Sequence, residues 1–398
     1  MPGKAVFATA LLLFVAGTST WAAPTDYVSS DPIGPSLDAG LAGASSGDYE
    51  VAISTSVHPY KLKELLGSYG SNPAAYATDI NDAGQISGYD NSLVPQALRW
   101  PKSGGTPEIV GTLWTGAVAI NAPGEVAGFW YSTNFYWSGS TVGGGWGGGG
   151  GLPGGNGRSS ASDLNDFGDI VGSSGAATGT RAYLAINGGG TLDLGDLPGG
   201  IDDSSAGAIN NLMQVVGASS ATDGQHAFLW TPTDGMTDLG TLLGSAGNSR
   251  ALDINSKSQV VGSSSTATVD HAFLWTSDGG MQDLGSLAAD ASSRAVAINN
   301  HGNVIGDSNG SVFIWTPSGG MQDLHTLLDS TGTGWTLLAV GGINNYNQIV
   351  GYGLNPDGDQ RAFLLTPVPE PSTIVLAVIG AAGLIAFGYR KRSANRNR

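Results

Sequence analysis

The sequence predicts an all-β protein whose short strands form a β-propeller of seven four-stranded blades. Three observations predict this class. Glycine contributes 64 of the 398 residues and charged residues only 12%, which is typical of many turns and short strands. One block of sequence recurs seven times, and two further blocks recur with the same period of 40 to 45 residues. A four-stranded sheet repeated at this spacing is the unit of a propeller, whereas a β-solenoid, the alternative, needs fewer residues per coil.

The first block reads Ala-x-x-Ile-Asn, then a turn, then an apolar pair that ends in Gly, as in the segment from Ala251 to Gly262. Its asparagines are spaced by 40, 44, 45, 45, 44 and 45 residues; they are Asn81, Asn121, Asn165, Asn210, Asn255, Asn299 and Asn344. Asparagine at the first position of a turn bonds the backbone that follows, and glycine at the fourth tolerates a left-handed conformation. We therefore expect each Asn to be structural. Pro123 and Met213 fit this turn poorly, so other turns are expected in units two and four.

The second block is an apolar strand, seen best in His226–Trp230 and His271–Trp275, and the third contains Asp-Leu-Gly, as in Gln282–Leu287. Consecutive apolar residues in a short strand indicate that both faces of the sheet are covered. The three blocks together predict four strands per unit. Because a propeller closes on itself, Asn81 and Asn344 are expected on blades that are adjacent in space.

This pattern resembles the HAF repeat, named for a His-Ala-Phe triplet that stands here at His226 to Phe228 and His271 to Phe273. The resemblance covers most of residues 58 to 367, which we take as the propeller domain. The two histidines occupy equivalent places in adjacent units. We therefore expect them on neighbouring blades, where packing at a strand edge is a better explanation than metal binding.

Two segments interrupt the pattern. The glycine-rich stretch Gly139 to Gly157 is expected to be a flexible loop that replaces the Asp-Leu-Gly strand of unit three. Residues 23–57 form a lead-in whose one strand candidate, Tyr49 to Val57, is either a ring-closing strand or part of the lead-in.

Residues 1–22 have the features of a secretory signal peptide. Lys4 precedes the apolar run from Ala5 to Gly17, and small residues follow it up to Ala23. Signal peptidase recognises this order of features, so cleavage is expected after Ala22 or Ala23. The apolar run is too short to favour a permanent membrane anchor. The body of the protein is therefore expected to be exported.

Residues 368–398 have the features of a membrane tail. Residues 373–389 carry no charge and are just long enough to span a bilayer as a transmembrane helix. The basic end, residues 390–398, begins with Arg390, Lys391 and Arg392, which are expected to stop transfer and stay in the cytoplasm. Pro369 and Pro371 disfavour a helix before the span, so an extended peptide there would be accessible to an enzyme.

Pro369-Glu370-Pro371, an apolar span and a basic end, in this order, resemble the PEP-CTERM sorting signal of Gram-negative bacteria. The resemblance implies a sorting role for these three residues and an exosortase-like processing enzyme as a partner. It also implies an intermediate tethered to the inner membrane, followed by a surface or extracellular location, in hosts that commonly make exopolysaccharide. A plain membrane anchor after a proline-rich linker is the alternative.

Charge and cysteine content exclude several classes of protein. All 32 acidic residues but only ten of the 16 basic ones lie between Asp26 and Glu370, so this stretch carries a charge of −22. Such a charge repels phosphate backbones, and no nucleic acid partner is expected. Because the sequence has no cysteine, neither disulfides nor a thiolate metal site is possible.

No set of residues in the sequence predicts a catalytic site or a bound cofactor. Asp79, Asp163 and Asp253 stand two residues before the turn Asn in three of the units. As carboxylates beside turn carbonyls, they are candidate ligands for Ca²⁺. We expect a non-enzymatic surface or matrix protein that binds polysaccharide or another envelope component. The alternative is a carbohydrate hydrolase or lyase, which acidic residues converging on the channel of the propeller would favour.

Overall fold

The computed structural model describes residues 60–67, 74–90, 95–102, 104–111, 115–130, 133–137, 142–144, 152, 158–244 and 247–368. Within these ranges the regular structure consists of β-strands and two short 3₁₀ helices, η1 (Leu324–Leu327) and η2 (Ser330–Gly332). The predicted all-β class is confirmed. The described ranges contain no helix that is long and apolar enough to cross a membrane. The predicted span, 373–389, lies outside them.

The strands form seven antiparallel four-stranded sheets. We call these sheets blades 1 to 7 in chain order, and we give the strands of each blade from the innermost outward. Blade 1 contains β2 (Ala75–Ile80), β3 (Ile86–Asp90), β4 (Ala97–Trp100) and β5 (Glu108–Ile109). Blade 2 contains β6 (Thr115–Ile120), β7 (Val126–Trp130), β8 (Thr133–Trp137) and β9 (Val142–Gly144). Blade 3 contains β10 (Ser159–Leu164), β11 (Ile170–Gly175), β12 (Thr180–Ala185) and β13 (Thr191–Asp193). Blade 4 contains β14 (Ser204–Ile209), β15 (Val215–Ser220), β16 (Gln225–Thr231) and β17 (Gly235–Asp238).

The last three blades complete the series. Blade 5 contains β18 (Ser249–Ile254), β19 (Val260–Ser265), β20 (Asp270–Thr276) and β21 (Gly280–Asp283). Blade 6 contains β22 (Ser293–Ile298), β23 (Val304–Ser308), β24 (Ser311–Thr316) and β25 (Gly320–Asp323). Blade 7 contains β26 (Thr336–Ile343), β27 (Ile349–Leu354), β28 (Gln360–Pro367) and β1 (Tyr60–Leu65).

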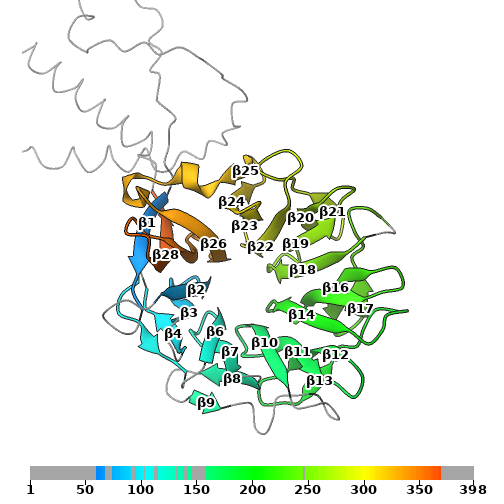
Figure 1. The fold of residues 1–398 in the computed structure, drawn as a ribbon. Helices are drawn as coiled ribbons and strands as arrows, with labels where there is room; N and C mark the ends of the chain where they lie inside the picture. Colours follow the sequence, from blue (N-terminus) through cyan, green and yellow to red (C-terminus); the bar gives the residue numbers. More distant parts are fainter. Residues whose placement is uncertain are drawn as a thin grey trace, which may run out of the picture. The chain divides into compact units, whose positions relative to one another are not determined.

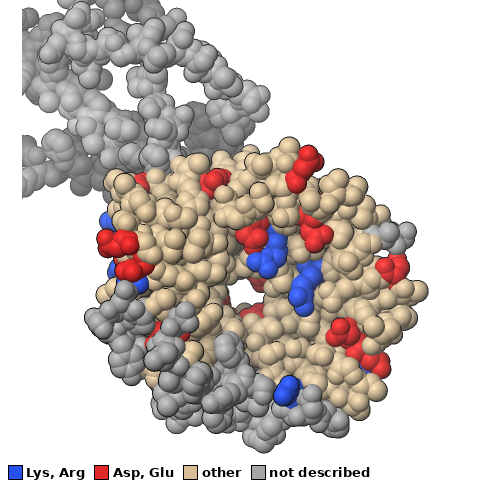
Figure 2. Space-filling view, viewed as in Figure 1, with Lys and Arg blue, Asp and Glu red and all other residues tan. Residues whose placement is uncertain are grey.

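The sheets stand in a ring with β2, β6, β10, β14, β18, β22 and β26 innermost (Figure 1), and the space-filling view shows a central opening, which we call the channel (Figure 2). Each blade packs on the next, and blade 7 packs on blade 1 through β27 and β2. The fold is therefore a β-propeller, and the solenoid alternative is wrong, because a solenoid has no such contact between its first and last units. The ring is closed by β1, which pairs with β28 from Tyr60↔Pro367 to Leu65↔Ala362. The closing strand is thus 60–65, whereas the sequence candidate, 49–57, lies outside the described residues.

The glycine-rich stretch was expected to be a loop, and this expectation is wrong at two places. Val142–Gly144 forms β9 and pairs with β8, so the stretch supplies the fourth strand of blade 2. Leu152 is buried, and its amide donates a hydrogen bond of 2.9 Å to Ser174 Oγ on blade 3. Leu197 makes the same contact with Ser219 between blades 3 and 4. A repeated structural position is therefore preserved within a low-complexity sequence.

All seven units use the same turn between the first two strands, which corrects the expectation for units two and four. In each turn the amide of the fourth residue donates to the carbonyl of the Asn, as Gly124 does to Asn121 and Met213 to Asn210. The fourth residue has a positive φ in each unit, 86° at Gly124 and 55° at Met213. Met213 therefore adopts the left-handed conformation without glycine, a cost that the surrounding hydrogen bonds offset.

The glycine that ends the first block faces a β-bulge. In blades 1 to 6 the pairing of the two inner strands shifts by one residue after the repeated Ala, for example between Ala251 and Asp253. The bulge brings the two backbones so close that a Cβ at Gly262 would overlap the carbonyl of Arg250. Only glycine fits such a position, which explains why the repeat keeps it.

The core lies between neighbouring blades rather than within one sheet. Phe228, Phe273, Phe313 and Phe363, at equivalent places on the third strands, are fully buried. Serines form hydrogen bonds across the same interfaces. Ser249 Oγ accepts from Ala227 N at 2.8 Å and donates to the carbonyl of Gly240 at 2.6 Å, and Ala227 and Gly240 both belong to the preceding blade. The repeated blocks therefore encode contacts between blades.

Candidate functional site

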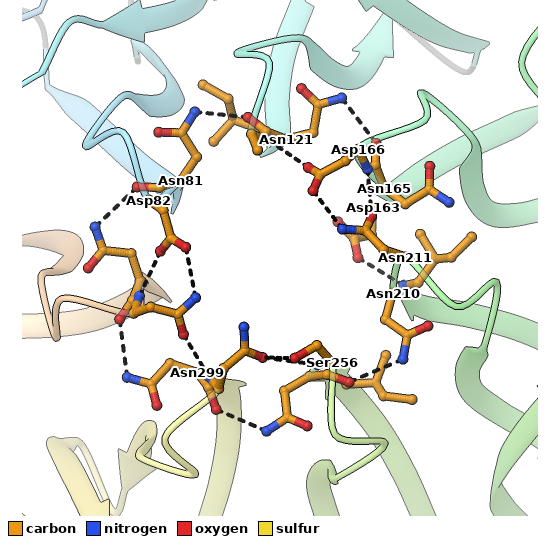
Figure 3. Close-up of a pocket in the computed structure, with 18 of the residues that line it drawn as sticks. Asn81, Asp82, Asn121, Asp163, Asn165, Asp166, Asn210, Asn211, Ser256 and Asn299 are labelled. Atoms are coloured by element: carbon orange, nitrogen blue, oxygen red, sulfur yellow. Dashed lines mark hydrogen bonds between the residues drawn. The ribbon is translucent and has the colours of Figure 1, made fainter.

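The first candidate site is the end of the channel where the seven Asn turns meet, which we call the asparagine mouth (Figure 3). It contains a cavity of about 250 Å³ lined by the seven asparagines and the residues next to them. Each Asn is almost fully buried. Asn255 is typical: its Oδ1 accepts from the amides of Lys257 and Gln259 within its own turn, at 3.0 and 3.1 Å.

The side-chain amides of the asparagines link neighbouring blades. Asn255 Nδ2 donates to the carbonyl of Asn299 at 2.9 Å. The corresponding bonds, of 2.8 to 3.1 Å, are Asn81 to Asn121, Asn121 to Asn165, Asn210 to Asn255, Asn299 to Asn344 and Asn344 to Asn81. These six bonds link six of the seven pairs of neighbouring blades in a polar belt, as the predicted structural role of the asparagines requires, while Asn165 Nδ2 donates to Asp169 within its own turn. The predicted proximity of Asn81 and Asn344 is confirmed.

The residues that follow the asparagines form a second set of contacts. The amide of Asn345 and its Nδ2 both donate to the carboxylate of Asp82 at 2.8 Å. Asp166 accepts from the amide of Ala122 and from Asn211 Nδ2, at 2.8 and 2.6 Å. The polar groups of this mouth are therefore largely occupied by contacts between blades, so its polarity is explained by the fold.

Asp79, Asp163 and Asp253 lie deeper in the channel, where they line a second cavity of about 150 Å³. One oxygen of each carboxylate accepts from the next amide in its own strand at 2.7 to 2.8 Å. The other oxygen accepts from an amide of the following blade, which belongs to Ile120, Ile209 or Ile298, at 2.7 to 3.0 Å. Each aspartate thus acts as a latch between two blades, a role that the sequence did not reveal.

The latches occupy alternate blades, which explains why the repeat does not keep the aspartate in every unit. Asp79 joins blade 1 to blade 2, Asp163 joins blade 3 to blade 4, and Asp253 joins blade 5 to blade 6. The blades that receive a latch carry alanine at this position, and blade 7 carries Gly342. A Cβ at Gly342 would lie 2.7 Å from Asp79 Oδ1. Blade 7, which is left outside the three latched pairs, therefore has room only for glycine at this position.

Burial raises the pKa of all three carboxyl groups. Desolvation raises the pKa of Asp79 to about 6 and that of Asp253 to about 7, although hydrogen bonds from the neighbouring amides oppose the shift. The pKa of Asp163 is raised well above its usual value by desolvation and by the charges of Asp79 and Asp253. Ionisation of these groups in the channel is therefore less favourable than ionisation of an aspartate in water, and Asp79 and Asp253 lose their protons only as pH approaches neutrality.

These three residues were the candidate calcium ligands, and the structure brings them to one channel. Within the described ranges, however, no three His, Asp or Glu side chains lie close enough together to hold one metal ion. Both oxygens of each carboxylate already accept amide hydrogens. Calcium binding here stays a prediction.

The two repeated histidines lie on β16 and β20, in neighbouring blades as expected. His226 Nδ1 lies 2.7 Å from Asp238 Oδ2, and His271 Nδ1 lies 2.9 Å from Asp283 Oδ2. The aspartates belong to the Asp-Leu-Gly block of the adjacent strand. The second and third blocks therefore recur together because they contact each other.

The second candidate site is the opposite end of the channel, where the innermost strands begin. We call it the strand-start mouth and define it by the second residue of each innermost strand with its partner on the next strand. The second residues of blades 1 to 6 are Tyr76, Gly116, Ser160, Ser205, Arg250 and Arg294, and the corresponding residue of β26 in blade 7 is Ala339, which pairs with Tyr352. This position varies in size and charge from blade to blade, whereas the asparagine mouth is nearly constant.

Among the side chains of the strand-start mouth that the structure describes, the large ones lie over blades 5, 6, 7 and 1. Arg250 donates to Ser205 Oγ at 3.0 Å, and Arg294 forms an ion pair of 2.8 Å with Asp307. Figure 2 shows Lys and Arg atoms beside the central opening, over the strands that carry these two arginines.

These large side chains include an aromatic cluster on blades 7 and 1. The ring of Tyr76 stacks on that of Tyr89 with centroids 4.8 Å apart, and it meets Tyr352 edge to face at the same distance. The three rings are partly exposed. Tyrosine and arginine are the residues that most often carry binding energy at protein surfaces.

The predicted tail residues Pro369, Glu370, Pro371, Arg390, Lys391 and Arg392 and the predicted signal peptide, 1–22, lie outside the described residues. The comparisons with known proteins bear on the tail. Residues 367–392 match the PEP-CTERM protein-sorting motif. This match implies a protein that is sorted to the exterior through its C-terminus. No curated protein matches the chain.

Two solved structures are similar to the chain at low identity. One is a catalytically inactive virginiamycin B lyase from Staphylococcus aureus with quinupristin, at 13% identity and a TM-score of 0.44, over 78% of this chain and 100% of that one. The other is the extracellular domain of a hybrid two-component system from B. thetaiotaomicron, at 11% identity and a TM-score of 0.42, over 76% of this chain and 39% of that one. Because the similarity is this low, we base the fold assignment on the sheet topology alone.

Proposed function

We propose that this chain is an exported surface or matrix protein whose propeller binds polysaccharide or another envelope component without catalysing a reaction. The contrast between the two ends of the channel supports this proposal. The asparagine mouth is built from a nearly constant set of residues that bond one another. The strand-start mouth presents tyrosine, glycine, serine, arginine or alanine on different blades, an asymmetry that suits an asymmetric ligand.

The sorting motif supports the route to the surface. In this proposal an exosortase-like enzyme processes the tail after the chain has been held at the inner membrane by its C-terminal span. The charge of −22 between Asp26 and Glu370 keeps the released body soluble and repels nucleic acid.

The test measures binding of the full chain, purified in detergent, to polysaccharide and envelope fractions of the host that exports it. Tyr76→Ala and Tyr352→Ala are expected to reduce binding about tenfold or more, the usual effect of losing an aromatic contact of this kind. Leu212→Ala, at the tip of an exposed turn of the asparagine mouth, is the matched control and should bind normally. Equal binding by all variants would place the ligand elsewhere on the protein, and no binding to any of these fractions would contradict the proposal.

One observation favours an enzyme as the second candidate. Three carboxyl groups with raised pKa converge on the channel from three blades, and such groups cluster at active sites. If one of them acts as a general acid or base, the full chain will release reducing ends or unsaturated products from a bound polysaccharide. Asp253→Asn would then abolish release without abolishing binding. Binding without any product, by the wild type, supports the binding module.

A further inference from the structure

We propose that the strand-start mouth binds a saccharide that carries carboxylate groups, with Arg250 as the contact for the carboxylate and the Tyr76–Tyr89–Tyr352 cluster as the stacking surface. This inference rests on the proposed binding function and names the class of its ligand.

The partner of Arg250 differs from those of four other arginines. Four arginines have a carboxylate partner within hydrogen-bond distance, and they are Arg99, Arg181, Arg294 and Arg361. Within the described part of the chain Arg250 has no such partner and donates to a hydroxyl group, Ser205 Oγ. Since guanidinium groups bind carboxylates in a bidentate manner, Arg250 offers an unfilled position for a carboxylate in a protein that is otherwise strongly acidic.

The comparison with Arg294 strengthens the argument, because the two residues occupy the same strand position on neighbouring blades. The residue paired with Arg294 across the strands is Asp307, which accepts from its Nε and Nη2 at 3.0 and 2.8 Å. The residue paired with Arg250 is Ser263, which carries no charge. Arg294 is therefore neutralised within its own blade, and Arg250 is not.

The rest of the mouth suits a polyhydroxylated ligand. The three tyrosines are partly exposed and carry hydroxyl groups, and their rings are ordered by contact with one another, so little conformational entropy is lost on binding. On blades 3 and 4 the residues at this mouth are small, and three of the four, Ser160, Ser173 and Ser205, carry a hydroxyl group. A sugar chain can thus contact aromatic faces, hydroxyl groups and a cation around one opening.

The experiment compares binding of the full chain to polygalacturonate and to its methyl-esterified form, which has the same sugars without the charges. We expect the esterified form to bind at least tenfold more weakly. Arg250→Gln should weaken binding of polygalacturonate by roughly 10- to 100-fold, the range for a lost hydrogen bond to a charged group. It should leave binding of the esterified form unchanged.

Two further variants separate this inference from a general effect of charge. Asp307→Asn removes the partner of Arg294 and should strengthen binding of polygalacturonate several-fold, whereas Lys257→Gln, which alters charge at the asparagine mouth, should have no effect. Melting temperatures check that all variants are folded.

Equal binding of both polysaccharide forms, with Arg250→Gln behaving as the wild type, would overturn this inference and leave the proposed binding function intact. Binding to neither form, together with no binding to polysaccharide or envelope fractions of the host, would overturn both.

Discussion

Asn344 Nδ2 donates a hydrogen bond of 3.1 Å to the backbone carbonyl of Asn81, although 263 residues separate the two in the sequence. The same bond joins five other pairs of consecutive units, so the first and last repeats meet as ordinary neighbours. The ring is thus closed at two places, by this bond in the channel and by β1 at the outer edge. Stability of the propeller should depend on both.

Asn255→Ala is expected to lower the free energy of unfolding by about 2 to 3 kcal/mol. The side chain makes four hydrogen bonds, and its loss would leave buried groups of two blades without partners, which costs more than a single bond. Urea unfolding of the wild type and the variant measures the change.

The control for this prediction is Lys257→Ala, two residues along the same turn, whose side chain is exposed. It should change stability by less than about 0.5 kcal/mol. If Asn255→Ala were as stable as this control, the belt would have no energetic role.

The sequence predicted much of the fold because the repeated blocks encode contacts between blades. The spacing of the asparagines indicated the units, and the triplet that begins at His226 indicated the third strand. The strand β9 was missed because glycine carries no side-chain pattern that could mark a strand. The turn at Met213 was missed because propensity disfavours its left-handed backbone, whereas bonds to neighbouring groups stabilise it.

The strand-start mouth was beyond prediction for a different reason. Arg250 and Tyr352 belong to different strands of different units, and no repeat relates them, so only the ring brings them to one opening. The aspartate latches had a signal in the sequence, their presence in alternate units. Their presence in alternate units also fitted calcium ligands, because the sequence does not show that the second oxygen of each carboxylate accepts from an amide of the following blade.

The three latches should make stability depend on pH. Their native pKa values lie above the value of about 3.9 expected in the unfolded chain, with Asp79 at about 6 and Asp253 at about 7. The unfolded state therefore releases these protons first as pH rises. The contribution of Asp79 and Asp253 is fully present below about pH 4 and falls as pH rises through their native pKa values of about 6 and 7. The contribution of Asp163 changes in the same direction.

Asp253→Asn removes one of these groups, so its loss of stability relative to the wild type should be larger at pH 4.5 than at pH 7.5. Urea unfolding across this range is the measurement, and Asp234→Asn, in an exposed turn, is the control. Parallel pH profiles for wild type and variant would show that the carboxyl group does not titrate as described.

Addition of CaCl₂ at pH 7.5 tests the calcium prediction, because a bound ion would stabilise the wild type and not the variant.

Gly342→Ala should destabilise the propeller by roughly 1 to 3 kcal/mol, the range for overpacking a close contact. The added Cβ would lie 2.7 Å from Asp79 Oδ1 and 3.0 Å from the Cα of the same residue. Combining it with Asp79→Ala should recover part of the loss, which a thermal unfolding series can measure. If the double variant were less stable than the sum of the single changes predicts, the contact between blades 7 and 1 would not be the cause.

The tail offers the last prediction, since residues 367–392 match a sorting motif whose three parts lie in a fixed order. A chain exported from its amino end and stopped by Arg390, Lys391 and Arg392 would leave Pro369-Glu370-Pro371 on the outer side of the inner membrane. Cleavage there would remove both the apolar span and the basic end. We therefore expect the mature protein to end near Ser372 and to lie outside the inner membrane, whereas a host that lacks the processing enzyme retains it there at full length. Mass spectrometry of the C-terminal peptide from native cells is the test. Stoichiometric recovery of peptides beyond Tyr389 would mean a permanent anchor, because the span could then not have been removed.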